Sequence, residues 1–425
     1  MFCIFETLKS VIWGVPTLVI LLVLGIYFTN KCKFYRFGAV KKTVRDTLGT
    51  LKNKSSNGIS PFKAVATALG GTVGVGSIIG VGYGIAVGGA GSVFWMWVCS
   101  FFGMGLKYAE VVVALKKRKT VNGKMLGGAH IRLDGLGYRK TALAFCFLCV
   151  IASFGTGNLT QSGSMASFFA SLGFTDVIVG LFCLILVAFA VFGGRARIAN
   201  INAVIIPVAS VIYLFACAVL LIINCKNIVP SLKNIVMEAF GFSAIGGGFS
   251  GALLAHTLRE GFARSMFSNE AGMGSSPLAH ATVENTSTDV QAKWGIFEIF
   301  FDTFVVSTVT ALCLLSSGFL SPADMFVSSF GKIGGFVFLL LIAVFAFASV
   351  ISWCYYAECC ISFLFSERNK TATVIYRILF ASVSFLGVYI SGKVIWEISD
   401  ILNALMMFPN LFLLFKCRNE IERID

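Results

Sequence analysis

Two short glycine-rich runs are the part of this 425-residue sequence best suited to binding chemistry. They occupy residues 70–76 (GGTVGVG) and 246–251 (GGGFSG). Glycine inside a helix costs about 1 kcal/mol relative to alanine, so clustered glycines make local unwinding easy. An unwound turn frees backbone carbonyls to coordinate a cation and leaves a helix N-terminus that attracts a carboxylate. Both runs therefore predict a site for a cation and a small zwitterion, held by backbone atoms.

Close helix packing is the alternative interpretation of clustered glycine. Gly76, Gly80 and Gly84 are spaced by four and form a small-residue ridge that lets two helices approach closely. For this later stretch packing is favoured. For 70–76 and 246–251 unwinding is favoured, because the two clusters stand at corresponding places in two halves of the chain.

Polar and aromatic residues within the apolar runs are candidates to complete these sites. Gln161 would reach a substrate amino group or form an interhelical hydrogen bond. Ser349 and Ser352 share a helix face, and would ligate a cation or bond back to their own helix. Trp353 lies far from the interfacial belt where tryptophan usually lies, so it would form an apolar wall for a substrate or belong to the core.

Other ionisable groups are interpreted as structural. Glu110 beside Lys107 predicts an ion pair near the surface. Asp302 is expected to lie near an ion path or to pair with Lys293 or a helix end, with the structural role favoured. Gating contacts or helix-end pairs are expected for His256, Arg259, Glu260 and His280.

The composition indicates a membrane protein. Charged residues make up 13% of the chain and hydrophobic residues 57%, where soluble domains carry about 25% charged residues. Apolar stretches of about 20 residues, enough to cross a bilayer, recur along the whole length. These runs are too long for barrel strands, and helices are the other backbone that spans lipid. We therefore predict an all-α integral membrane protein.

The basic residues gather in two loops. The net charge is +14, and of the 34 Lys and Arg residues eight fall between Lys31 and Lys54 and eight between Lys116 and Lys140. The positive-inside rule puts both loops in the cytoplasm, the N-terminus outside and the C-terminus inside, as in a bacterial cytoplasmic membrane. Few base-stacking aromatic residues accompany these charges, so no nucleic-acid partner is expected. The thirteen cysteines are scattered and are expected to pack as small apolar residues, with neither disulfides nor zinc.

About eleven membrane spans are predicted. They lie near residues 11–29, 62–87, 92–115, 141–170, 174–192, 201–223, 239–268, 293–317, 332–365, 374–391 and 396–416. Without the first span, two sets of five remain, and each opens with a glycine run. Because five is odd, the second set enters the membrane from the opposite side, which is the inverted repeat of many secondary transporters. The predicted parts are 1–60 (first helix and basic loop), 61–225 (first repeat) and 226–425 (second repeat and short tail).

Motifs along the whole chain resemble the alanine or glycine:cation symporter family. Thr72-Val73-Gly74, 94–97 (FWMW) and 107–110 (KYAE) follow in order in the first half. The densest match is 247–252 (GGFSGA) followed by 267–277 (FSNEAGMGSSP), a string highly specific to this family. Trp353 with 355–358 (YYAE), and 400–406 (DILNALM), continue the resemblance.

The resemblance implies a leucine-transporter-like 5+5 inverted repeat with one additional N-terminal transmembrane helix, and sodium-driven uptake of alanine or glycine. The implied substrate-binding residues are Thr72, Gly74, Val75, Gly76, Gln161, Gly247, Gly248, Phe249, Ser250, Gly251 and Trp353. The implied sodium ligands, partly backbone carbonyls, are Gly71, Thr72, Gly74, Ser349 and Ser352. No organic cofactor is expected. The expected partners are the substrate and the lipid bilayer, and a monomer is expected to be sufficient.

Four positions depart from the family pattern. The family usually has Thr at Val75, Asn at Ser77, Asn at Gly163 and Ser at Ala348. Each change removes or shortens a polar group, and losing a buried hydrogen-bond partner costs about 1–3 kcal/mol. The choice between alanine and glycine, and between sodium and a proton, is therefore open.

Two other classes of membrane protein fit less well. A membrane-embedded enzyme needs a nucleophile with a positioned base, or paired acids. The three histidines and the dispersed carboxylates show no such spacing, so no enzyme activity is expected. A channel needs a continuous polar pore lining, which glycine-broken helices do not supply.

Overall fold

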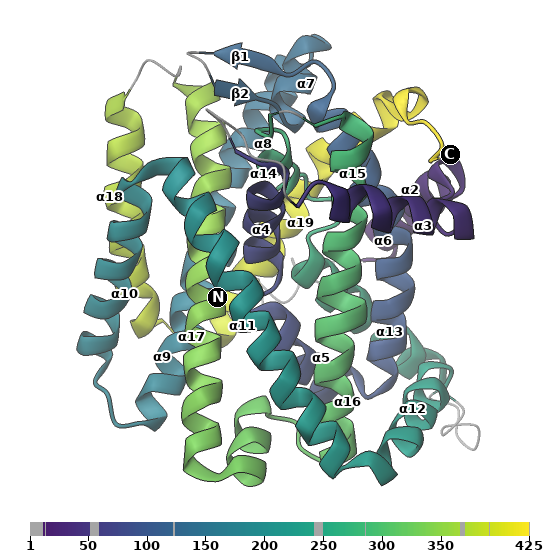
Figure 1. The fold of residues 1–425 in the computed structure, drawn as a ribbon, viewed down its shortest axis with the longest axis vertical. Helices are drawn as coiled ribbons and strands as arrows, with labels where there is room; N and C mark the ends of the chain where they lie inside the picture. Colours follow the sequence, from purple (N-terminus) through teal and green to yellow (C-terminus); the bar gives the residue numbers. More distant parts are fainter. Residues whose placement is uncertain are drawn as a thin grey trace.

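The computed structural model describes residues 12, 14–51, 59–121, 124–241, 250–284, 286–365, 370–390 and 392–424, and these form a bundle of helices (Figure 1). The helices are α2 (Val15–Cys32), α3 (Phe37–Gly49), α4 (Pro61–Thr72), α5 (Val81–Gly88), α6 (Gly91–Leu115), α7 (Ala129–Gly135), α8 (Arg139–Ala152), α9 (Thr160–Ser171), α10 (Asp176–Phe192), α11 (Gly194–Ile223), α12 (Cys225–Ala239), α13 (Ser250–Asn269), α14 (Pro277–His280), α15 (Thr288–Ile299), α16 (Thr308–Ser317), α17 (Pro322–Leu364), α18 (Lys370–Leu386) and α19 (Gly392–Lys416). π-Helical turns occupy Gly76–Gly80, Ser153–Leu159 and Phe300–Ser307, and 3₁₀ turns occupy Gly387–Tyr389 and Arg418–Glu420. The strands β1 (Lys119–Val121) and β2 (Lys124–Leu126) pair antiparallel.

The described helices confirm a multi-pass membrane protein. Seven of them are long and apolar enough to cross a bilayer, and nine are if each of two bent helix pairs counts as one span. The two remaining predicted crossings correspond to α10, an apolar helix of 17 residues, and α13, which carries more polar residues. The predicted total of eleven crossings therefore stays a prediction.

Proline and serine define where two of the site-bearing helices begin. Ser60 caps α4 by accepting a hydrogen bond from the Lys63 N–H, and Pro61 follows at the first helical position. Ser321 and Pro322 repeat this arrangement at the start of α17. The long α17 then continues to Leu364, with one non-helical residue at Gly331.

Helices α6 and α17 form the centre of the bundle. The most apolar 18-residue stretch of α6 is 83% buried inside the protein, whereas the corresponding stretches of α11 and α18 are 33% buried. The exposed faces of the two outer helices carry Val211, Phe215, Ile378 and Leu379. Contiguous exposed apolar surface of this kind is what lipid covers in a membrane protein.

One end of the bundle gathers the β-hairpin, α3, α7 and the C-terminus (Figure 1). The C-terminal tail is tied to both basic loops there: the Lys31 ammonium donates to the Arg418 carbonyl, and the Lys116 ammonium donates to the Glu420 carbonyl. Arg132 pairs with the Glu420 carboxylate. The two basic loops and the tail therefore lie on the same side of the bundle, which we call the basic end.

Candidate functional site

The first glycine run interrupts a helix. Helix α4 ends at Thr72, Val73 adopts an extended conformation, and the chain resumes as a π-helical turn at Gly76. The two helical halves are bent by 47°. Backbone groups are therefore released between Gly71 and Gly76, halfway between the basic end and the opposite end (Figure 1).

Three predicted site residues lie together at this break. The Ser349 hydroxyl donates to the Gly71 carbonyl at 3.3 Å. A Cβ at Gly74 would lie 3.5 Å from the Ser349 Cβ and 3.7 Å from the Gln161 Oε1. Gln161 is buried, and its Oε1 has no hydrogen-bond partner among the described residues. A carbonyl, a hydroxyl and an unsatisfied amide oxygen thus face the same short stretch of backbone.

Other predicted residues lie at the edge of this group. The Thr72 hydroxyl bonds back to the Ala68 carbonyl of its own helix, and its own carbonyl accepts from Ser77. Ser352 accepts a hydrogen bond from the Asn202 Nδ2 at 2.8 Å, beside Gly70 and one turn from Ser349. Val75 is fully buried, and Gly76 packs on the Phe267 ring.

Trp353 is fully buried against a glycine of the fourth predicted span. A Cβ at Gly157 would lie 2.2 Å from the Trp353 Cβ, so only glycine allows this contact. The Trp353 ring also meets Tyr356 edge-on at 5.7 Å. The indole therefore fixes α17 against the π-helical turn Ser153–Leu159, where Gly157 lies about one helical turn before Gln161.

A second helix break lies further along the chain than the second glycine run. Helix α13 ends at Asn269, and Glu270, Gly272 and Gly274 take positive φ angles before α14 begins at Pro277. The expected break at 246–251 falls mostly outside the described residues, which omit Gly247, Gly248 and Phe249. Ser250 and Gly251 belong to the first turn of α13. The described break thus coincides with the family-specific string 267–277. Its two glycines, Gly272 and Gly274, were the signal that the sequence offered.

The second break is held by buried polar side chains. The Glu110 Oε1 accepts from the Gly274 N–H at 2.9 Å and from the Asn410 amide, which also donates to the Gly272 carbonyl. The Lys107 ammonium donates to the Glu270 carbonyl at 3.0 Å. These partners satisfy the non-helical backbone, as burial in a membrane protein requires.

The expected ion pair between Lys107 and Glu110 is present, but its expected position near the surface was wrong. Both side chains are fully buried, 3.9 Å apart, and Lys107 also pairs with Glu298 at 3.6 Å. His280, expected as a helix-end contact, is buried and bonds to Glu298 and Gln291. A lysine three residues from a glutamate indicated the pair but not the second break that surrounds it.

Asp302 is a functional candidate that the sequence interpretation undervalued. Its buried carboxylate accepts hydrogen bonds from Ser77 (2.5 Å), Ser268 (2.8 Å) and Thr303 (3.1 Å). Lys293, named as its expected partner, instead pairs with Asp46 and Asp289. Among the described residues no basic side chain forms an ion pair with Asp302. The hydroxyl groups come from both broken helices, so this carboxylate lies where the two breaks meet.

Three π-helical turns converge on the site. Gly76–Gly80 carries Ser77, Phe300–Ser307 carries Asp302, and Ser153–Leu159 carries the glycine under Trp353. π-Helical turns are rare and often occur at functional sites because they widen a helix locally. Their convergence here marks the same region that the first glycine run indicated.

A buried ion pair closes the side of the site away from the basic end. The Arg264 guanidinium on α13 donates to the Asp400 carboxylate on α19 at 2.7 Å. Arg264 also lies over the rings of Tyr83, on α5, and Phe267. This layer joins three helices just beyond the first break.

The sequence matches a known family over almost its full length. The profile of the sodium:alanine symporter family covers residues 2–423. A sodium/alanine symporter, AgcS, of Methanococcus maripaludis is 36% identical over 96% of this chain and 92% of its own length. A probable sodium/glutamine symporter, GlnT, of Bacillus subtilis is 32% identical over 96% of this chain and 86% of its own length.

The fold resembles that of a solved amino-acid transporter. The crystal structure of MhsT in complex with L-phenylalanine superposes with a TM-score of 0.64, covering 86% of this chain and 90% of that one, at 14% identity. MhsT has the leucine-transporter fold. At this identity the likeness concerns the fold alone.

Proposed function

Because the chain belongs to the sodium:alanine symporter family, we propose that it carries alanine or glycine across the membrane together with sodium. The family and its relatives support a sodium-coupled amino-acid symporter, and not an enzyme. The choice of a small neutral amino acid rests on the residues at the first break. The observation that carries the proposal is the group formed by the Gly71 carbonyl, the Ser349 hydroxyl and the free Gln161 Oε1 around Gly74.

In the proposed site a helix N-terminus and one side chain hold the two charges of the substrate. The helix N-terminus that begins at Gly76 attracts the substrate carboxylate, while the Gln161 Oε1 accepts from its ammonium. A Cβ added to Gly74 would be in ordinary van der Waals contact with Ser349 and Gln161, so the space beside Gly74 is about that of a methyl group, which supports a small substrate. Trp353, Val75 and Gly76 form the apolar surroundings. The predicted roles of Gly247, Gly248, Phe249, Ser250 and Gly251 stay predictions.

Sodium is assigned to the carbonyl and hydroxyl oxygens on the other side of the break. Oxygen ligands suit a hard cation, and the Gly71 carbonyl with the Ser349 hydroxyl supplies two of them. The carbonyls of Thr72 and Gly74 are proposed to add further ligands. Ser352 would join them only if its hydrogen bond from Asn202 is exchanged for the ion.

A proton-coupled symporter is the second candidate, and Asp302 is the observation that favours it. A buried carboxylate surrounded by three hydroxyls can take up a proton or a second cation, and either would neutralise its charge. We assign the coupling cation to this carboxylate as well as to the Ser349 position. Measuring which ion gradient drives uptake decides whether this cation is sodium or a proton.

The proposed mechanism is alternating access. The Arg264–Asp400 pair closes one side of the site, and the Lys107 network holds the second break on the side of the basic end. Binding of substrate and cation at the breaks would favour the change from the conformation closed by one of these two sets of contacts to the conformation closed by the other. A membrane potential of 100 mV, negative inside, adds about 2.3 kcal/mol to the free energy that drives uptake for each cation that enters. The proposed arrangement keeps the 5+5 inverted repeat, a monomer, the N-terminus outside and the C-terminus inside.

Uptake of radiolabelled alanine into proteoliposomes tests the proposal. We expect accumulation when an inward sodium gradient is imposed, none when choline replaces sodium, and no loss when a protonophore is added. Uptake that ignores sodium and disappears with the pH gradient would establish the proton symporter instead. Absence of alanine and glycine uptake under both gradients would reject the proposed substrates.

A further inference from the structure

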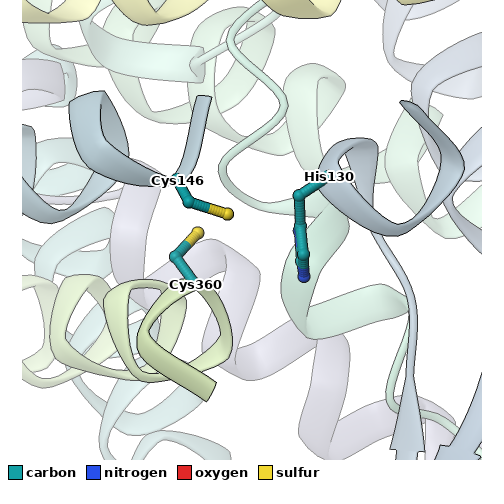
Figure 2. A group of neighbouring side chains, drawn as sticks. All are labelled: His130, Cys146 and Cys360. Atoms are coloured by element: carbon teal, nitrogen blue, oxygen red, sulfur yellow. The ribbon is translucent and has the colours of Figure 1, made fainter. Parts of the chain in front are cut away.

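Three metal-ligating side chains from separate helices meet outside the proposed transport site (Figure 2). His130 lies on α7, Cys146 on α8 and Cys360 on α17, and all three are buried. Their potential ligand atoms lie within 4.8 Å of one another. Figure 2 shows the two thiol groups pointing toward each other, with the imidazole ring edge-on beside them.

The histidine carries an unsatisfied polar atom. No described residue forms a hydrogen bond with the Nδ1 of His130, whose side chain is 1% exposed. A buried polar atom without a partner costs about 1–3 kcal/mol. The ring is held between Phe145, stacked at 6.3 Å, and Phe363, edge-on at 5.2 Å, so the imidazole cannot turn freely to find another partner. A bound metal ion would satisfy it.

From this geometry we propose that His130, Cys146 and Cys360 form a binding site for a soft divalent metal ion, with zinc as the natural type and cadmium as its analogue. Thiolate and imidazole are the ligands that zinc prefers. Two thiolates neutralise a divalent ion, so the complex is uncharged in a buried place, whereas a monovalent copper ion would leave one net negative charge. Binding forms two metal–sulfur bonds and one metal–nitrogen bond and releases the two thiol protons to water, with no change of oxidation state.

The distances require only a small contraction. Zinc–sulfur bonds of about 2.3 Å and zinc–nitrogen bonds of about 2.0 Å bring tetrahedral ligand atoms to roughly 3.5–3.8 Å from each other. Rotation of the cysteine side chains covers the difference from 4.8 Å. Cys149 lies one helical turn from Cys146, and its thiol interacts with that of Cys360, so it is placed to supply a fourth ligand.

Access to the ion would come from the basic end. Cys146 lies seven residues into α8, about 10 Å along the helix, and Cys360 lies four residues before the end of α17. The seven-residue α7, which carries His130, lies at this end of the bundle (Figure 1). A small displacement of α7 would open the cluster to water.

The proposal departs from the expectation that the cysteines serve only as packing residues. Cys146 and Cys149 form a Cys-x-x-Cys pair, which was a signal in the sequence. His130 lies 16 residues before Cys146, whereas Cys360 lies 214 residues after it, so the sequence spacing did not show that Cys360 belongs to the same group. The fold, and not the local sequence, brings them together.

A bound ion would tie α7 and α8 to α17, the helix that carries Ser349 and Trp353. We therefore expect cadmium to inhibit transport. This consequence rests on the proposed function, whereas binding itself does not.

Metal binding is tested on the purified full chain in detergent, with Cys225→Ser as the background because Cys225 is exposed. Cadmium is titrated while the ultraviolet thiolate-to-cadmium absorbance is recorded, and the metal content is measured after dialysis. We expect one cadmium ion per chain. Cys146→Ala and Cys360→Ala should each weaken binding by about tenfold or more, since removing even an outer partner of a metal ligand has that effect.

The controls separate ligation from folding. Cys183→Ala removes a buried cysteine of α10 and should leave cadmium binding unchanged. His130→Asn should weaken binding while the protein still elutes as a single species in size-exclusion chromatography. Equal cadmium binding in Cys146→Ala, Cys360→Ala and Cys183→Ala would overturn the proposal. So would a Cys146–Cys360 disulfide found by mass spectrometry, or no bound cadmium at all. Because these readouts do not involve uptake, a failure of the transport proposal would leave them intact.

Discussion

The polar groups around the first break differ in whether they already have a hydrogen-bond partner. Ser349 donates to the Gly71 carbonyl, which would accept a backbone N–H if the helix were unbroken. The Gln161 Oε1, in contrast, has no partner among the described residues. A buried amide oxygen without a partner stores free energy that a bound ammonium group would release. The proposed site is therefore a set of oxygen atoms that can accept a cation or an ammonium group.

We expect Ser349→Ala to raise the sodium concentration for half-maximal alanine uptake by about tenfold, because losing one buried oxygen partner costs about 1–3 kcal/mol. The matched control is Ser382→Ala, which removes an exposed serine that bonds only to its own helix. Sodium-dependence curves in proteoliposomes measure both. An unchanged curve for Ser349→Ala would remove this residue from the ion site.

Asp302→Asn should lower the charge moved per alanine by about one elementary charge if the carboxylate carries a coupling cation. The substitution keeps the shape of the side chain and removes the negative charge, and it replaces one acceptor oxygen by an N–H donor to which a neighbouring hydroxyl can turn its oxygen. Transport current and radiolabelled uptake, recorded on the same proteoliposomes, give the ratio. Asp324→Asn, in the first turn of α17, is the control. An unaltered ratio would show that Asp302 has a purely structural role.

Sequence reasoning reached some of these residues and missed others for a physical reason. Ser349 and Gln161 were named because a polar side chain is costly in an apolar run. Asp302 was noticed for the same reason but given the wrong partner, since its hydroxyl contacts come from Ser77 and Ser268 on other helices. Long-range neighbours of this kind are decided by packing, which residue spacing does not encode.

At the scale of the element, irregular helices position the site. The first break was indicated by four glycines in seven residues, and the helix indeed ends at Thr72. The second described break contains only Gly272 and Gly274, with charged and polar neighbours, so the string was treated as a family signature and not as an interruption. Its shape depends on Glu110 and Asn410, which lie in other helices and were invisible to a local pattern.

Gly157→Ala should disrupt the packing of α17 on the π-helical turn, because the new methyl group would meet the Trp353 Cβ at 2.2 Å. Overpacking of this kind costs about 1–3 kcal/mol or more. We expect a lower unfolding temperature and loss of most alanine uptake. Gly38→Ala, on α3 with nothing within 4 Å, should change neither. Equal behaviour of the two variants in thermal unfolding and uptake would contradict this contact.

At the scale of the whole molecule, buried charges join helices that are distant in sequence. Composition and positive-inside bias predicted a helical membrane protein, and the described helices and the family agree with that. The total of eleven crossings stays a prediction, and the pairing of Arg264 with Asp400 did not follow from the sequence. The pair links α13 to α19 across 136 residues of chain.

Removing one partner of this buried pair should destabilise the protein more than removing both. An unpaired buried charge costs about 3–5 kcal/mol, while apolar replacement of both partners is often nearly neutral. We expect Arg264→Met to lower the unfolding temperature in detergent further than the double variant Arg264→Met/Asp400→Leu does. A double variant that is less stable than the single one would mean that Asp400 stabilises the protein through contacts other than the one with Arg264.

The segment from Ser268 to Pro277 touches the Asp302 carboxylate at its start and is held by Lys107, Glu110 and Asn410 along its length. If each turnover rearranges this segment, several hydrogen bonds must be exchanged at once where water is scarce. The activation enthalpy would then be large, and transport would slow steeply on cooling.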